Sequence, residues 1–392
     1  MNPCSARSGP RRTSINPSTF GLGYVRKVAR NLPSKRFAEH LRDAKVRSTS
    51  TQQVYSMKAI GYRVPGNIDR EDSFVDIELP QPKPAGRDIL VEVKAVSVNP
   101  VDYKVRQGTA PLNEEWKVVG YDAAGIVTEV GPETQFFKPG DEVFYAGSID
   151  RSGTNAQFHL VDERIVGSKP RTLGFAEAAA MPLTSITAWE ALFDRLDVRR
   201  EVPGAARAIV IVGGAGGVGS MAVQLARYLT DLTVVATASR PETSAWASQM
   251  GAHHVIDHSK PLAAQVAALN IGAPSFVFST TQTNRHASEI AELIAPQGRF
   301  ALIDGLADAG LFMRKSVSIH WELMFTRPLF KTADIDGQHT LLNEVARLVD
   351  EGVLRTTMTE RFAPLKAANL KRVHKLVETG TTRGKYVLEG FR

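Results

Sequence analysis

A glycine-rich segment, AIVIVGGAGGVGS, is the strongest chemical signal in the chain. Gly214, Gly216 and Gly219 satisfy the pattern G-x-G-x-x-G, and an apolar run at 208–212 precedes them. Glycines at this spacing let the chain turn tightly, let a pyrophosphate approach the backbone, and let a helix pack closely on a strand. The segment therefore predicts a dinucleotide site. The alternative is a glycine-rich turn that holds no ligand.

The elements around this turn must present it to a phosphate. After the turn, apolar residues recur on one face of an expected helix, and a second apolar run, LTVVAT, completes a unit of about 30 residues. Gly217 and Val218 open that helix, whose first N–H groups are unpaired and favour negative charge. We therefore place both residues in the cofactor site.

The second strand ends at Ser239 and Arg240, and this ending bears on which nicotinamide is bound. An NAD-preferring site usually carries Asp or Glu about 20 residues past the motif, to hold the ribose hydroxyls. Here a serine hydroxyl and an arginine guanidinium take the place of the acid, and Arg can form bidentate hydrogen bonds with a 2′-phosphate. The sequence predicts NADPH, with Ser239 and Arg240 at its phosphate. The alternative is an exposed loop arginine.

The order of expected elements predicts more than one domain in this chain of 392 residues. Short strand-like runs fill 57 to about 165, strands alternate with helices after Pro203, and a mixed tail begins near 331. No apolar run approaches the roughly 20 residues of a membrane span.

Residues 1–56 carry a net charge of +9. Because the whole chain carries +7, residues 57–392 carry −2, and the basic character belongs to the N-terminal segment. Nucleic-acid binding is therefore not indicated for the body of the chain. The first 56 residues are rich in Arg and Ser and predict either a disordered tail of a cytoplasmic protein or a mitochondrial transit peptide.

Several motifs together resemble the medium-chain dehydrogenase/reductase superfamily, closest to its quinone oxidoreductase branch. They are MKAIGY, VSVNPVDYKVRQG, GYDAAGIVTEVG, FKPGDEVF, AAAMPLTSITAWEAL, GGAGGVGS and RGKYVLEGF. The resemblance covers 57–392 and implies an α/β fold: a Rossmann doubly wound parallel sheet inserted into a GroES-like β-barrel catalytic domain. It implies the boundaries 57–181 (catalytic), 182–330 (Rossmann) and 331–392 (catalytic again). A homodimer is common in that branch.

Zinc alcohol dehydrogenases are similar here but carry a Cys where this chain reads Asn99-Pro100-Val101-Asp102, and a His where it has Tyr121. The only cysteine is Cys4, so no structural four-cysteine cluster exists. We predict no metal. The segment GAHHVIDH is rich in possible ligands, but it fits a strand with its flanking loops better than a metal site.

Without a metal, a quinone or an α,β-unsaturated carbonyl is the expected hydride acceptor, because charge delocalises onto a conjugated oxygen that hydrogen-bond donors can hold. The resemblance places the catalytic candidates in the former metal pocket, and they are Asn99, Asp102, Tyr103, Lys104 and Tyr121. It also places further cofactor contacts at Thr187, Ser279, Asp304 and Lys385. His320, Trp321 and Phe325 are expected either to shape an aromatic pocket or to pack in the core.

Two other functions fit the same motifs. An enoyl or alkenal reductase acting on aliphatic chains would use the same cleft with a different pocket shape. A non-catalytic NADPH-binding protein would need only the glycine turn, and the presence of the 99–104 segment weighs against it.

Overall fold

The computed structural model describes residues 55–112 and 115–391. All of them belong to one compact unit, Ser50–Arg392. The predictions for the basic N-terminal extension fall almost entirely outside the described residues and stay predictions. In the described part of the chain, no helix is long and apolar enough to cross a bilayer.

One half of the fold is a six-stranded parallel sheet with the order β11-β10-β9-β12-β13-β14. Its strands are β9 (Ala206–Val212), β10 (Thr233–Thr237), β11 (His254–Ile256), β12 (Pro274–Ser279), β13 (Arg299–Leu302) and β14 (Ser318–Trp321). In chain order this is 3-2-1-4-5-6, the strand order of a Rossmann sheet. The predicted doubly wound parallel sheet is confirmed.

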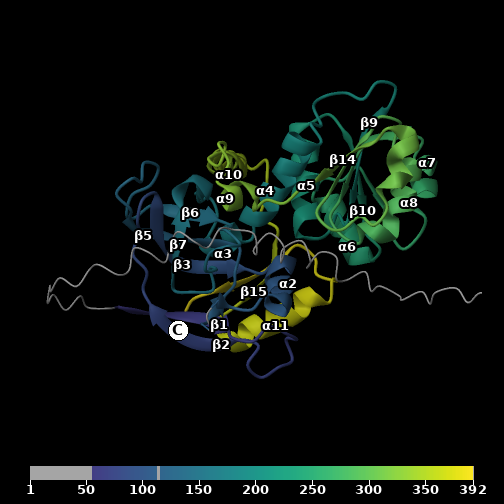
Figure 1. Cartoon of the computed structure of the whole chain (residues 1–392). Coiled ribbons are helices and arrows are strands. Elements are labelled where there is room, and N and C mark those ends of the chain that lie inside the picture. Colours follow the sequence, from purple (N-terminus) through teal and green to yellow (C-terminus); the bar gives the residue numbers. More distant parts are fainter. Residues whose placement is uncertain (1–54, 113–114, 392) are drawn as a thin grey trace, which may run out of the picture. The chain divides into compact units, whose positions relative to one another are not determined.

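Helices cover both faces of this sheet, with α5 and α6 on one side and α7 and α8 on the other (Figure 1). They are α5 (Gly217–Leu229), α6 (Pro241–Gln249), α7 (Leu262–Ala268) and α8 (Thr283–Leu293), with the short helix η5 (Ala309–Lys315) before β14. Because both faces are covered, the central strands are apolar throughout, and the run from Ala208 to Val212 is fully buried.

The other half is a mainly antiparallel sheet with the order β15-β16-β3-β5-β6-β8, with β7 also paired to β3. The strands are β3 (Asp88–Ser97), β5 (Ala123–Val130), β6 (Glu142–Tyr145), β7 (Phe158–Asp162), β8 (Val166–Ser168), β15 (Met358–Phe362) and β16 (Lys385–Glu389). The C-terminal strand β16 pairs with β3, so the two ends of the chain build one sheet around the inserted Rossmann part.

The remaining elements pack on these two sheets. A smaller sheet contains β1 (Ser56–Tyr62), β2 (Val75–Pro80) and β4 (Lys117–Val118). The helices are α2 (Pro100–Gly108), η3 (Glu163–Ile165), α3 (Phe175–Ala179), α4 (Pro182–Trp189), the π-helical turn η4 (Glu190–Arg195), α9 (Thr326–Phe330), α10 (Gly337–Asp350) and α11 (Ala367–Glu378). Helix α4 packs against both α5 and α10 and so joins the two halves.

Candidate active site

The glycine turn lies between β9 and α5, as its sequence predicts. Gly213 has a φ of 81°, a conformation in which a side chain would be strained, and it starts the tight turn after Val212. A methyl group at Gly214 would lie 2.6 Å from the Ala236 side chain, and one at Gly219 would lie 2.1 Å from the Gly213 carbonyl oxygen. These two glycines are therefore required for the close packing of strand and helix.

Gly216 differs, because a methyl group there would meet only the Gly213 oxygen, at 3.5 Å. Gly216, Gly217 and Val218 are partly exposed, while the helix behind them is buried through Met221 and Leu225. The first turn of α5 thus presents open backbone to a ligand, and the turn fits the pyrophosphate of a dinucleotide.

Asp122 is the centre of a buried polar group that we call the Asp122 cluster, made of Ser97, Asn99, Asp122, the Leu183 N–H and Lys385. Its carboxylate accepts hydrogen bonds from Ser97 Oγ (2.9 Å), Asn99 Nδ2 (2.7 Å), Lys385 Nζ (2.9 Å) and the Leu183 N–H (2.7 Å). These donors come from the end of β3, the start of α4 and the start of β16. One carboxylate therefore fixes three elements at the former metal pocket.

Lys385 joins this cluster to the glycine turn. Its ammonium group also donates to the Val98 carbonyl (3.1 Å) and to Asn99 Oδ1 (2.5 Å). Its stem passes the first turn of α5, since a methyl group at Gly217 would lie 2.9 Å from Lys385 Cδ. The sequence predicts Lys385 as a cofactor contact; in the structure its ammonium group is buried and pairs with Asp122 at 2.9 Å.

Among the five catalytic candidates, all of which the structure describes, only Asp102 and Tyr121 have a buried side-chain atom without a hydrogen-bond partner. Asp102 Oδ2 accepts from the Asn99 N–H at 2.6 Å, but its Oδ1 is buried without a donor. The Tyr121 hydroxyl is also buried without a partner, and its ring meets Phe325 edge-on at 5.3 Å. Burial raises the pKa of Asp102 to about 7 and raises the pKa of Tyr121 well above its usual value. Tyr121 therefore stays a neutral donor.

The other two catalytic candidates, Tyr103 and Lys104, are less buried. Tyr103 is half-buried, and burial, followed by the Glu378 charge, raises its pKa. Lys104 is exposed on α2. The proposal below therefore depends on Asp102 and Tyr121.

Several predicted cofactor contacts are already bonded to protein groups. Thr187 Oγ1 donates to the Leu183 carbonyl one helical turn earlier, at 2.8 Å. Thr283 Oγ1 donates to the Asp304 carboxylate and also lies within hydrogen-bond distance of Ser279 Oγ (2.8 Å), and the Thr283 N–H donates to Asp304 at 3.1 Å. Asp304 thus binds the start of α8. Its expected contact with the cofactor stays a prediction.

Ser239 and Arg240 lie at the end of β10, where the sequence placed them. Ser239 is exposed. Arg240 donates to the Thr381 carbonyl through Nη2 (2.6 Å) and pairs with Glu242 through Nε (3.2 Å). Both side chains are accessible to a ligand on the glycine turn.

Of the aromatic residues expected at an acceptor pocket, Phe325 is buried against Tyr121, whereas Trp321 is 57% exposed on β14. The core-packing alternative is therefore wrong for Trp321, and the aromatic-pocket alternative stays a prediction.

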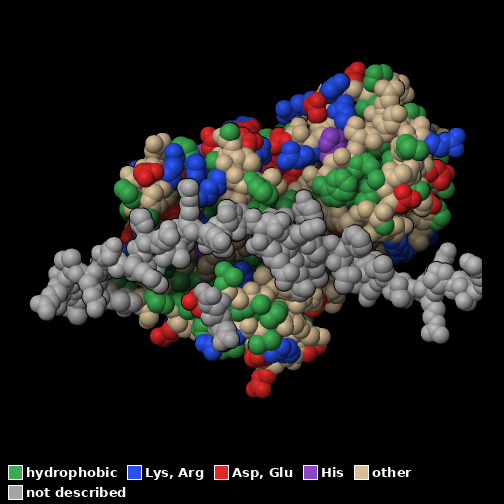
Figure 2. All heavy atoms as spheres, viewed as in Figure 1, with side chains coloured by type: hydrophobic (Ala, Val, Ile, Leu, Met, Phe, Trp, Pro, Cys, Tyr) green, Lys and Arg blue, Asp and Glu red, His purple; other side chains and the backbone are tan. Residues whose placement is uncertain are grey.

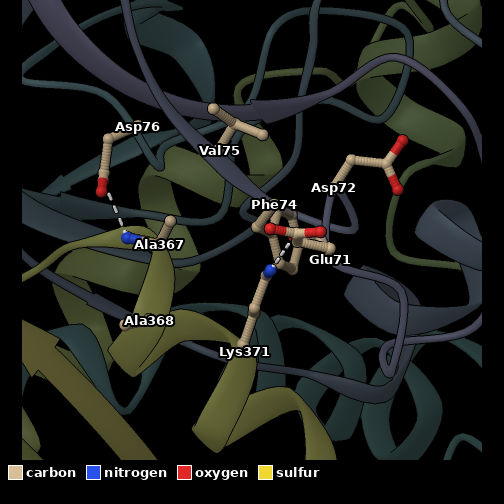
Figure 3. A pocket seen from close by; sticks show the side chains of 8 residues that line it. All are labelled: Glu71, Asp72, Phe74, Val75, Asp76, Ala367, Ala368 and Lys371. Carbon is tan, nitrogen blue, oxygen red and sulfur yellow. Dashed lines mark hydrogen bonds between the residues drawn. The ribbon is translucent and has the colours of Figure 1, made fainter.

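A surface hollow of about 750 Å³ lies elsewhere, between β2 and α11 (Figure 3). Its polar groups already bond to each other: Asp76 accepts from the Ala367 N–H at 2.8 Å, and Lys371 donates to the Glu71 carbonyl. It contains none of the groups of the glycine turn.

No single sign of charge dominates the face in Figure 2, where acidic and basic side chains are interspersed.

The donor set does not fit a zinc ion. Among the described residues, no three His, Cys, Asp or Glu side chains are grouped as metal ligands. Asn99 uses both ends of its amide within the Asp122 cluster, and the neutral Tyr121 hydroxyl is a poor ligand for zinc.

Known proteins agree with this architecture. The model of the alcohol dehydrogenase GroES-like domain matches residues 85–190, and that of the zinc-binding dehydrogenase family matches 250–388. A zinc-type alcohol dehydrogenase-like protein of Staphylococcus aureus is 38% identical over 336 residues, 85% of this chain and 99% of its own length. A Rhizobium etli crystal structure assigned to the zinc-dependent alcohol dehydrogenases is 70% identical, with a TM-score of 0.85, covering 86% of this chain and 99% of that one.

A third relative, the 2-methylene-furan-3-one reductase of Solanum lycopersicum, is 34% identical over 221 residues, 54% of this chain and 55% of its own. The chain belongs to the medium-chain dehydrogenase/reductase superfamily, in its quinone oxidoreductase-like branch. It is an oxidoreductase whose fold binds a nicotinamide cofactor. The predicted family is confirmed.

Sequence reasoning missed one residue of this site. Asp122 is not among the predicted site residues, yet it is the acceptor on which the cluster depends. An acidic residue among apolar neighbours directly before a strand, as in GYDAAG, was the available signal for Asp122.

Proposed function

We propose that this protein is an NADPH-dependent reductase of quinones or α,β-unsaturated carbonyls that works without a catalytic metal. The observation that carries the proposal is the pair of buried, unpartnered groups Asp102 Oδ1 and Tyr121 OH at the position where zinc relatives bind their metal. The bound nicotinamide would supply the hydride. The relative that reduces a methylene-furanone supports an enone as the acceptor class.

The chain's own residues would do three things in this reaction. The glycine turn and the start of α5 would hold the pyrophosphate, with Ser239 and Arg240 at the 2′-phosphate. The Tyr121 hydroxyl, a neutral donor, would stabilise negative charge on the acceptor oxygen. Asp102, whose pKa is about 7, can carry the proton that must follow the hydride.

The test is NADPH oxidation by the purified protein with a benzoquinone, an acyclic enone and a simple aldehyde, each with and without a chelator. We expect the quinone or the enone to be reduced at an unchanged rate in the chelator, and the aldehyde to react poorly. Tyr121→Phe should lower kcat by about 10- to 100-fold and leave the Kd for NADPH within twofold. Activity lost to the chelator and restored by zinc would overturn the proposal.

We also propose that two copies pair through the edge of the Rossmann sheet. Strand β14 is the last strand of that sheet, and the large apolar side chains exposed on it and after it are Trp321, Leu323 and Phe330. An exposed edge of this kind usually has a partner. Light scattering should give a dimer mass, and Trp321→Glu should give a monomer.

A further inference from the structure

The loop 379–384, between α11 and β16, lies on the glycine turn although it comes from the other half of the fold. The Gly384 N–H donates to the Ala215 carbonyl at 2.9 Å, and Gly384 forms a parallel bridge with Gly216. Gly384 has a φ of 55°, and a methyl group there would lie 2.3 Å from the Thr357 carbonyl oxygen. The loop is therefore fixed to the dinucleotide turn by its backbone.

Two arginines meet at this loop from opposite halves of the molecule. Arg240, at the end of β10, donates to the Thr381 carbonyl at 2.6 Å. Arg383, in the loop itself, places its guanidinium 5.1 Å from the centre of the Trp246 ring on α6. Burial and the Glu360 charge raise the pKa of Tyr386, while Arg383 and Arg240 both act to lower it, so both positive charges lie near this one phenol.

The two arginines differ in how far their charge is already neutralised. Arg240 pairs with Glu242 at 3.2 Å. Arg383 forms no ion pair with a carboxylate among the residues that the structure describes; its partner is the Trp246 ring, whose Nε1 donates to Ser220 Oγ on α5 at 2.8 Å. A guanidinium held over an aromatic face keeps its N–H edge free for a bidentate contact.

The charge of the cofactor requires this second cation. A phosphate monoester carries nearly two negative charges at neutral pH. Arg240, offset by Glu242, supplies less than one net positive charge at the end of β10. We propose that Arg383 is the second arginine of the 2′-phosphate site, and that the catalytic half of the fold thereby contributes to the choice of NADPH over NADH. The proposal rests on the proposed function and adds a selectivity residue to it.

Calorimetric titration of NADPH and NADH into the full-length protein tests this role. We expect Arg383→Gln to raise the Kd for NADPH at least tenfold, a loss of about 1.4 kcal/mol, and to change the Kd for NADH less than twofold. Arg240→Gln should act in the same direction, and the double variant should bind the two cofactors about equally. Arg372→Gln is the matched control, because Arg372 also stacks on an aromatic ring, that of Phe362 at 5.3 Å, but on α11.

The outcomes separate this proposal from the proposed function. A wild-type protein that does not prefer NADPH overturns the NADPH assignment, and Arg383 with it, before any variant is made. If the wild type prefers NADPH, equal weakening of both cofactors in Arg383→Gln would show that the loop is only structural, and unchanged NADPH binding would remove Arg383 from the site. If Arg372→Gln raised the Kd for NADPH as much as Arg383→Gln does, the effect would come from the loss of any positive charge. That result would also overturn the proposal.

Discussion

Two buried carboxylate groups in this molecule are handled in opposite ways. In the Asp122 cluster a single carboxylate accepts four hydrogen bonds and faces one ammonium group, that of Lys385. In the second group, which we call the Glu190–Glu322 pair, two buried carboxyls from η4 and the end of β14 lie close enough to hydrogen bond to each other. Arg327 binds Glu190 at 2.6 Å and Arg195 binds Glu322 at 3.0 Å.

The difference lies in the unsatisfied atoms. Neither oxygen of Asp122 lacks a donor, whereas Glu190 Oε2 and Glu322 Oε1 are both buried without one. Two carboxylates cannot both stay ionised at this distance, so the pair must share a proton. Burial, followed by the Glu190 charge, raises the pKa of Glu322 to about 9. Asp122, whose oxygens all accept hydrogen bonds, holds its neighbours in place. The Glu190–Glu322 pair, in which two oxygens lack a donor, makes the free energy of unfolding depend on pH.

Removing the acceptor of the first cluster should have the largest effect. Asp122→Ala leaves the Lys385 ammonium buried without a counter-charge, and we expect a loss of about 3–5 kcal/mol in the free energy of unfolding. Urea denaturation measures it. The control is Asp69→Ala, which breaks an exposed pair with Lys375 and should change stability by less than about 1 kcal/mol. Equal losses in the two variants would remove Asp122 from the centre of the cluster.

The Glu190–Glu322 pair should show its proton in the pH dependence of stability. Because the folded state holds the Glu322 proton up to about pH 9 and the unfolded chain releases it near 4.5, stability should fall as the pH rises between these values. Glu322→Gln keeps the neutral form, so the fall should become shallower by up to about 1.4 kcal/mol per pH unit. Urea midpoints at pH 5, 7 and 9 measure the slope. Glu344→Gln, at a more exposed ion pair, should leave it unchanged.

Asp102 combines features of both groups, since one of its oxygens is bonded and the other is not. The charged groups nearest to it are Lys385, which lowers its pKa, and Asp122, which raises it, after the larger effect of burial. As its carboxyl loses its proton near pH 7, activity should fall with rising pH. Asp102→Asn should remove this inflection from the profile of kcat/KM while lowering the maximum less than about tenfold. A profile that keeps its inflection would assign the proton to another group.

The sequence and the structure agree most where a function depends on neighbouring residues. The glycine turn and the alternation of strands and helices after Pro203 follow from local patterns, and the placement of Gly213 to Gly219 matches the predicted turn. Asp122 and Lys385 are 263 positions apart, so no spacing rule relates them. The same holds for Glu190 and Gln338, which bond at 3.2 Å across 148 positions. Such pairs exist only once both halves of the chain have folded.

The smallest effect is expected at Lys104, two residues from Asp102 on the same helix. Helix α2 buries Asp102 toward the former metal pocket and leaves the Lys104 side chain exposed. Lys104→Ala should therefore change the free energy of unfolding by less than about 0.5 kcal/mol. Its kcat and KM should stay within about twofold of the wild type. If Lys104→Ala instead abolished reduction while NADPH still bound, the proton donor would lie on the exposed face of α2. Asp102 would then lose its assigned role as the proton donor.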